Sequence, residues 1–412
     1  MLSNFSRFAA IALLCVSCGI AAPGQAQKKY DPGASDTEIK IGNTVAYSGP
    51  VSSYGTIGKV EAAYFKKINE EGGINGRKIN FISYDDANSP PKTVEQTRKL
   101  VESDEVLFVF SAIGTGPNGA VQKYLNAKRI PQLFVGSGAA KWGKPESFPW
   151  TIGLQPTYQS EGRVFAKHIL EHYPNAKIAV LSQNEDFGKD YVKGLRDGLG
   201  SRADSMIVAE KTYEVTDPTV DSQIVALKAS GANVMMSFVT PKAASQAIRK
   251  MGEIGWSPVH FLAGISNSVG SVIKPAGFET AQGIISSAYM KDPTDAAWAE
   301  DAPIREWIAF MERYYPEGDK TNSLNVYGYL AAQTVVQVLR NCGEDISRVN
   351  IMKEAANLKE FELGLLLPGI KINTSRTDYY PIEQLQTMRF EGQGWHRFGP
   401  VMVGEIGSGQ SQ

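Results

Sequence analysis

The sequence predicts an α/β protein built from two doubly wound parallel-sheet lobes. Three observations support this fold class. Short runs of β-branched residues alternate with amphipathic helical patterns from Glu38 onward, and the same alternation begins again after Pro149. The 412-residue chain is also longer than a single hydrophobic core usually supports. Strands that alternate with helices through short connections form a parallel sheet covered by helices on both faces.

The first series begins with a strand over 39–45, and the apolar helical pattern that follows it stops at Gly72-Gly73. Its later strands are expected over 78–84, 106–111 and 132–136, with helices over 93–103 and 119–127. The second series has helices expected over 159–172, 189–199, 221–230 and 243–254, and strands over 177–182, 205–213 and 234–238.

The last third of the chain departs from this alternation. It contains helical patterns over 307–315, 327–340 and 352–356, and a closing hairpin of 388–390 with 394–398. Parallel sheets bind ligands at the carboxyl ends of their strands. Two such lobes that face each other would therefore place both sets of strand ends at one cleft.

Residues 1–26 have the features of a cleavable export signal. A single basic residue precedes an apolar run too short to span a membrane, and a small-residue cleavage site ends at Ala26. Cleavage there removes Cys15 and Cys18, so that Cys342 alone remains and no intramolecular disulfide can form. The sequence therefore predicts a periplasmic protein held together by its cores, with lipidation at Cys18 as the alternative.

Charge and hydropathy exclude several kinds of partner. The chain has 42 Lys and Arg against 43 Asp and Glu, without an evident polybasic face, so nucleic acid and anionic membranes are not expected to bind. After the leader, no apolar run reaches the ~18 residues that a membrane span needs. We expect a globular monomer that inserts into no membrane.

Two motif matches are better explained without metal or cofactor chemistry. His168 and His172 form an H-x-x-E-H pattern, but His168 falls on a packing face, His172 ends a helix, and no third zinc ligand is evident. The segment 114–119 matches a dinucleotide fingerprint, but the acidic residue expected about 20 residues later is missing. No metal, cofactor or catalytic residue is therefore expected. The glycine turn instead offers backbone N–H groups that could hold a carboxylate.

Aromatic residues recur where the predicted strands end. Tyr54 follows the first strand, Tyr158 opens the first helix of the second lobe, and Phe187 follows the strand that ends at Ser182. Aromatic walls hold small apolar or planar solutes in clefts. This recurrence predicts a ligand cleft between the two lobes.

In these features the chain resembles periplasmic solute-binding proteins of the branched-chain amino-acid (Leu/Ile/Val-binding protein) type, which serve ABC importers. The resemblance runs from about Thr37 to Gly399. It rests on 39–45 followed by Ser48-Gly-Pro and Tyr54-Gly, on Glu71-Gly-Gly-Ile-Asn-Gly-Arg, on Tyr84-Asp-Asp, on Pro131-Gln-Leu-Phe-Val and on Asn184-Glu-Asp-Phe-Gly. It implies a type I periplasmic binding protein, whose two lobes are joined by three crossings and close over a ligand.

The resemblance also implies domain bounds and site residues. The N-terminal lobe would be 37–154 with 289–367, the C-terminal lobe 155–288 with 368–405, and 406–412 a flexible tail. Backbone N–H groups and hydroxyls of two glycine turns would hold a ligand carboxylate, and Phe187 would stack over the ligand. The expected ligand contacts are Tyr54, Gly114, Thr115, Gly138, Ala139, Ala140, Tyr158, Phe187, Thr240, Ile265 and Tyr327.

Two departures from the family pattern bear on the ligand. Amino-acid binders carry a carboxylate where this chain has Tyr158, and a second one after the strand near 259–263, where this chain reads Ala263-Gly264-Ile265-Ser266. Both would pair with an α-ammonium group, which is costly to bury alone. The missing acids favour an aromatic or aliphatic carboxylate or a neutral amide. A branched-chain or other apolar amino acid is the alternative, with Glu161 or Asp186 as substitute acids.

We therefore expect a non-enzymatic protein that captures a small organic solute and delivers it to an inner-membrane ABC permease. Two other classes are open to test. A sensor ectodomain would need a membrane span or a signalling domain, for which the sequence offers no candidate. A periplasmic hydrolase would turn over ester or amide substrates.

Overall fold

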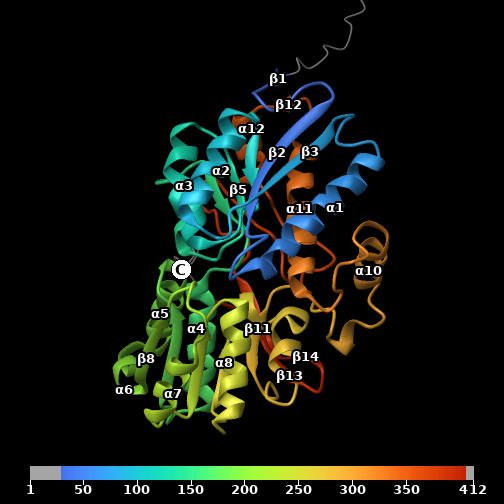
Figure 1. Cartoon of the computed structure of the whole chain (residues 1–412). Helices are drawn as coiled ribbons and strands as arrows, with labels where there is room; N and C mark the ends of the chain where they lie inside the picture. Colours follow the sequence, from blue (N-terminus) through green and yellow to red (C-terminus); the bar gives the residue numbers. More distant parts are fainter. Residues whose placement is uncertain (1–28, 405–412) are drawn as a thin grey trace, which may run out of the picture.

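The computed structural model describes residues 29–404, so the leader 1–26 with Cys15 and Cys18, and the tail 406–412, lie outside the described residues. Two lobes are stacked one above the other, with α3 and α5 facing each other where they meet (Figure 1). Within residues 29–404, no helix combines the length and the apolar character that crossing a bilayer requires.

The N-terminal lobe is built on a five-stranded parallel sheet in the order β3-β2-β4-β5-β6. Its strands are β2 (Glu38–Val45), β3 (Lys78–Asp85), β4 (Phe108–Phe110), β5 (Gln132–Val135) and β6 (Thr151–Gly153). Its helices are α1 (Gly55–Glu70), α2 (Pro90–Glu102), α3 (Thr115–Ala127), α10 (Ala302–Tyr314), α11 (Ser323–Asn341) and α12 (Arg348–Ala355). A small ladder pairs β1 (Lys29–Tyr30) with β12 (Asp345–Ile346).

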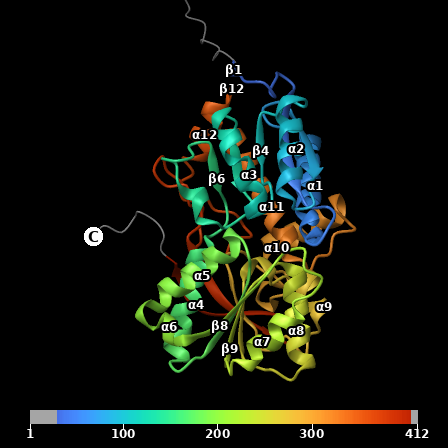
Figure 2. The same ribbon diagram turned by 60° about the vertical axis from the view of Figure 1, so that its left-hand side comes forward.

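The C-terminal lobe is built on a seven-stranded sheet in the order β14-β13-β11-β10-β9-β7-β8. Its strands are β7 (Ile178–Gln183), β8 (Ile207–Tyr213), β9 (Val234–Phe238), β10 (Val259–Leu262), β11 (Ile285–Ala288), β13 (Gln384–Glu391) and β14 (Gly394–Val403). Its helices are α4 (Tyr158–His172), α5 (Asp186–Leu199), α6 (Ala203–Met206), α7 (Asp221–Ala229), α8 (Pro241–Glu253) and α9 (Lys274–Ala276). The β13–β14 hairpin joins this sheet in antiparallel pairing. Figure 2 shows the helices of the C-terminal lobe packed around the sheet.

The chain passes between the lobes three times, after β6, after β11 and before β13. Side-chain caps fix the starts of three helices near these crossings. The Thr157 hydroxyl accepts the Ser160 N–H at 3.0 Å at the start of α4, and Asp301 and Asn322 cap α10 and α11 in the same way. Of these helices, α4 and α11 begin beside the space between the lobes.

The predicted fold class of two doubly wound lobes is confirmed, but several helices begin earlier than expected, and two of these starts bear on the space between the lobes. Helix α3 starts at Thr115 instead of residue 119, because Gly114 adopts φ 105° and Pro117 is tolerated within a first helical turn. Helix α5 starts at Asp186 instead of residue 189. Both N-termini therefore reach the space between the lobes, which places Thr115 and Phe187 on helices and not on loops.

Candidate functional site

A cavity lies between the two lobes, with an empty volume of about 1090 Å³ counting the solvent at its mouth. The N-terminal lobe lines it with residues at the starts of α1, α3 and α11, and the C-terminal lobe with residues from α4, α5 and the ends of β7, β10 and β11. The crossings and strand β13 supply further parts of the wall. The carboxyl ends of both parallel sheets thus meet at one cavity, as parallel-sheet topology requires.

The cavity brings together most of the residues that the sequence singled out. Its lining includes Tyr54, Gly114, Thr115, Tyr158, Phe187, Thr240, Ile265 and Tyr327. Gly138, Ala139 and Ala140 are not among its lining residues.

The turn at Gly138 to Ala140 faces the second lobe instead of the cavity. The Tyr158 N–H donates to the Gly138 carbonyl oxygen at 2.7 Å, and a Cβ on Gly138 would lie 2.7 Å from the Tyr158 ring. The Ala140 N–H donates to the Asp190 carboxylate on α5 at 2.8 Å. The N–H group expected to hold a ligand therefore forms a contact between the lobes.

Aromatic rings form the wall of the cavity on the side of the C-terminal lobe. The ring of Tyr158 stacks on Tyr191 with centroids 4.7 Å apart, and Phe187 meets both rings edge-on at 5.1 and 5.5 Å. Tyr191 in turn stacks on Phe238 at 4.6 Å. Since these rings support one another, the wall offers a rigid apolar surface to a planar or aliphatic solute.

Glycines at the contact between α4 and α5 hold this aromatic wall in place. A Cβ on Gly162 would lie 2.7 Å from the Tyr191 carbonyl oxygen, and one on Gly194 would lie 2.3 Å from the Gln159 carbonyl oxygen. Both distances are shorter than any Cβ contact tolerates, so the two helices pack this closely only without side chains there. The close contact brings Tyr158 and Tyr191 into stacking distance.

Thr115 presents a hydrogen-bond donor to the cavity. Its hydroxyl lies 2.7 Å from the Ser137 hydroxyl, and the Ser137 oxygen accepts from Trp142 Nε1 at 2.9 Å and from the Ala139 N–H at 3.3 Å. With both lone pairs of Ser137 occupied, Ser137 donates its proton to Thr115. The hydroxyl proton of Thr115 can then be donated to the neighbouring Tyr158 hydroxyl or to an acceptor on a solute.

Glu161 places a buried carboxylate on the cavity wall. Its Oε1 accepts from the Gly264 N–H at 2.7 Å and the Ser287 hydroxyl at 2.9 Å, and its Oε2 accepts from the Tyr191 hydroxyl at 2.5 Å. Burial raises the pKa of Glu161 to about 7, against these three hydrogen bonds, which lower it. Asp186, the other substitute acid considered from the sequence, is exposed and pairs with Lys141 at 3.0 Å.

The two charged residues that the crossing after β11 brings to the wall both have partners within the protein. Lys291 is the one basic residue among the described lining residues, and its Nζ binds both Asp301 oxygens at 2.9 and 2.8 Å beside the Trp298 ring. Asp292 accepts from the Thr294 backbone and hydroxyl, and burial raises its pKa to about 6. No lining cation that the structure describes is therefore free to neutralise an anionic solute.

Sequence reasoning missed the part of the wall that comes from the crossings and the closing hairpin. Gln155, Tyr289 and Met290 line the cavity from the crossings, and Leu385 and Met388 line it from β13. No motif marks these positions, because each lies in a segment without helix or strand periodicity or in a short apolar run. Gln155 Oε1 and the Tyr327 hydroxyl are buried there without a hydrogen-bond partner among the described residues.

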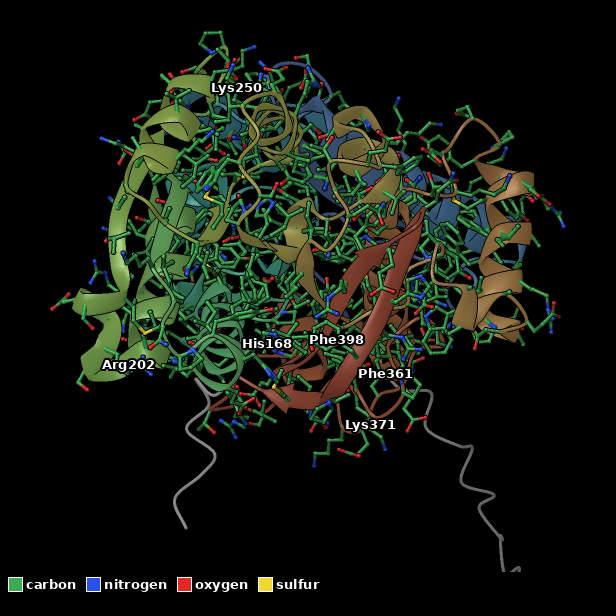
Figure 3. The ribbon with its side chains drawn as sticks, turned by 90° about the horizontal axis from the view of Figure 1, so that it is seen from below. His168, Arg202, Lys250, Phe361, Lys371 and Phe398 are labelled. Atoms are coloured by element: carbon green, nitrogen blue, oxygen red, sulfur yellow. The ribbon has the colours of Figure 1, made fainter. Side chains whose placement is uncertain are left out.

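The histidine pair serves packing. The rings of His168 and His172 lie 4.3 Å apart at a tilt of 46°, and His168 meets Phe398 of β14 edge-on at 5.5 Å. Figure 3 labels His168 and Phe398 next to each other on the underside of the molecule. Burial lowers the pKa of His168 to about 4, so its ring is neutral at physiological pH. In residues 29–404, no cluster of three or more His, Cys, Asp or Glu side chains is arranged to hold a metal ion.

Two doubly wound lobes that enclose an aromatic-walled cavity define a solute-binding protein. Residues 38–394 match the family model described as periplasmic binding protein, and the chain belongs to this family. The resemblance read from the sequence is thus confirmed, and the family consists of binding proteins, not enzymes.

Similar proteins and solved structures also support this family assignment. The chain is 25% identical over 321 residues to Leu/Ile/Val-binding protein homolog 1 of Brucella suis, covering 76% of this chain and 81% of that protein. A branched-chain amino acid ABC transporter protein of Thermus thermophilus with bound valine shares the fold, with a TM-score of 0.80 at 17% identity over 90% of this chain and 97% of that one. A fatty acid ABC transporter substrate-binding protein of Thermomonospora curvata has a TM-score of 0.78 at 18% identity, over 91% of this chain and 95% of that one.

Proposed function

We propose that this chain is the extracytoplasmic binding component of an ABC importer and that it captures a small organic solute without an α-ammonium group. The lobes close over the solute, which the aromatic wall of Tyr158, Phe187 and Tyr191 contacts on one side. The closed protein then delivers it to an inner-membrane permease. The family membership and the names of the relatives support the transport role.

The residues that line the cavity are the main support for the proposed ligand class. Tyr158 lines the cavity where amino-acid binders resembling this chain carry an acid, and the segment 263–266, where a second acid is usual, adds Gly264 and Ile265 to the wall. Thr115 offers a donor and Gln155 an unpartnered acceptor, which suits a polar end group such as an amide or a carboxyl. The rest of the solute would be aromatic or aliphatic.

Glu161 keeps a second candidate open, which is a branched-chain or other apolar amino acid. A carboxylate has about four lone-pair positions, and the three donors around Glu161 leave one of them unused. An α-ammonium group could bind there. We favour the first class because the Glu161 carboxylate is already satisfied by the protein and its burial raises its pKa.

A thermal-shift panel separates the two candidates, because a ligand that binds only the folded state raises the unfolding temperature. We expect aromatic or aliphatic acids or amides to raise it and leucine, isoleucine and valine to leave it unchanged. Strong stabilisation by leucine, with none by the other compounds, would refute the proposed ligand class. Mass spectrometry of solute extracted from the purified protein identifies the ligand directly.

A further inference from the structure

Glu185 of the C-terminal lobe reaches across the cavity to the first turn of α3 in the N-terminal lobe. Its Oε2 lies 2.7 Å from the position that a Cβ on Gly116 would occupy. The Gly116 N–H also favours the ionised carboxylate, since it lowers the pKa of Glu185 against the effect of burial. The glycine therefore makes room for the side chain, and the first turn of α3, whose N–H groups carry partial positive charge, receives a carboxylate from the protein itself.

Two neighbouring acids on α5 make matching contacts across the same gap. Asp186 pairs with Lys141 at 3.0 Å, and Asp190 accepts the Ala140 N–H at 2.8 Å. Asp190 is itself fixed by Gln159 Nε2 at 2.8 Å. The three acids at the start of α5 thus form a set of contacts, here called the α5 clasp, that ties the two lobes together when they are closed.

The clasp changes which charge the cavity can accept. The turn at the start of α3 was expected to hold a ligand carboxylate, but the Glu185 carboxylate already faces it. Glu161 and Asp292 add further acids to the wall, while Lys291 is held by Asp301. A second carboxylate brought by a solute would meet like charges without a free cation, which is an unfavourable juxtaposition in a partly desolvated site.

We propose that Glu185 reserves the start of α3 for the protein, so that the solute enclosed beneath the α5 clasp carries a neutral primary amide where other ligands would carry a carboxylate. An amide fits the remaining groups, because its oxygen can accept from Thr115 and its NH₂ can donate to Gln155. This inference rests on the proposed function and narrows its ligand class to amides.

Matched pairs of amide and acid on one carbon skeleton test the inference. Benzamide with benzoate, and isovaleramide with isovalerate, are titrated calorimetrically into the full protein at pH 8.5. Burial and the neighbouring Asp186 raise the pKa of Glu185 to about 7, against Lys141 and the Gly116 N–H, so the carboxyl is ionised at this pH. We expect wild type to bind an amide about tenfold or more tightly than its acid.

Two variants then assign the discrimination to Glu185. In Glu185→Ala the acid should gain about tenfold in affinity while the amide changes by less than about threefold. Glu185→Gln should also lower the ratio of amide affinity to acid affinity. Glu171→Gln removes a charge from an exposed position at the end of α4 and should leave the ratio unchanged. Thermal unfolding of each variant confirms that it is folded.

Three results would overturn the inference. They are wild type binding an acid as tightly as its amide, Glu185→Ala leaving the ratio unchanged, or no amide binding at all. The proposed function is judged separately. It stands if a carboxylate is bound by the protein or extracted from it, and it fails if neither acids nor amides nor amino acids bind.

Discussion

The carboxyl group of Glu61 is fully buried in α1, and neither oxygen makes a hydrogen bond of normal geometry among the described residues. Burial raises its pKa well above 4.5, and the nearby Ser111 hydroxyl lowers it only in part. The group is therefore protonated in the folded protein over a pH range in which the unfolded chain would release the proton. Folding then takes up a proton, which costs stability as the pH rises.

The free energy of unfolding of Glu61→Gln should increase relative to that of wild type as the pH rises. Wild type keeps its full stability at pH values below the pKa of Glu61 in the unfolded chain. Above that pH it loses about 1.4 kcal/mol per pH unit, until the pH reaches the pKa of Glu61 in the folded protein. Urea denaturation of both proteins between pH 4 and 8 measures the difference, with Glu171→Gln as the exposed control. A difference that does not vary with pH would show that Glu61 is ionised when folded.

Substitution of Glu161 distinguishes the two ligand candidates. Gln keeps an oxygen acceptor for the Gly264 N–H and the Ser287 hydroxyl, and the Tyr191 hydroxyl can reverse its role. For a solute without an ammonium group we expect Glu161→Gln to change the affinity by less than about threefold. A loss of about a hundredfold or more in calorimetric titrations would instead indicate a charged partner for Glu161.

At the scale of elements, the starts of α3 and α5 determine how the lobes meet. A Cβ on Gly116 would press on Glu185, whereas Ala favours the helix itself by about 0.5–1 kcal/mol. Gly116→Ala should therefore leave stability equal or higher and lower the affinity for the solute. In a Glu185→Ala background the same substitution should cost no affinity, and a double-mutant cycle measures this coupling. If the affinity changes of Gly116→Ala and Glu185→Ala simply add in the double mutant, the effect of Gly116→Ala does not act through Glu185.

The contact between α4 and α5 should tolerate no side chain at Gly194. Ala there would force the two backbones apart, because its Cβ would lie 2.3 Å from the Gln159 carbonyl oxygen, and overpacking of this kind costs about 1–3 kcal/mol. Urea denaturation of Gly194→Ala should show that loss. Lys193→Ala, on the exposed side of the same helix, is the control and should stay within about 0.5 kcal/mol. Equal stability of the two variants would contradict the close packing described here.

The order of strands and helices could be predicted because periodicity and glycine turns are local signals. The strand over 39–45 and the helix ending at Gly72-Gly73 correspond to β2 and α1. The start of α3 could not be placed, because the Gly and Pro that signal a loop are also tolerated in a first helical turn. The edge strand β6 (Thr151–Gly153) was missed because it is too short to show a period.

Some residues of the candidate site could also be predicted from local signals, whereas others could not. Tyr54, Tyr158 and Phe187 stand at the ends of predicted strands or the starts of helices, so their arrival at one cavity follows from topology. The partners of Glu185 and Asp190 depend on how two lobes approach each other, and no sequence period encodes that. Whether the site residues bind a solute remains a prediction.

At the scale of the whole molecule, capture of a solute requires the two lobes to close. The cavity is formed by both lobes and the crossings, and the α5 clasp forms only when the lobes are together. A solute that binds across the cavity should therefore shift the population toward the closed arrangement. The three crossings would act as the hinge.

Distances between spin labels in the two lobes test this most directly. Lys123→Cys on α3 and Ser205→Cys on α6 are exposed, while Cys342 is buried with its pKa raised to about 12, so it should stay protonated and unlabelled. Double electron–electron resonance should give a broad distance distribution without solute and a shorter, narrower one when a solute from the panel binds. A solute that binds without changing that distribution would contradict capture by closure of the two lobes.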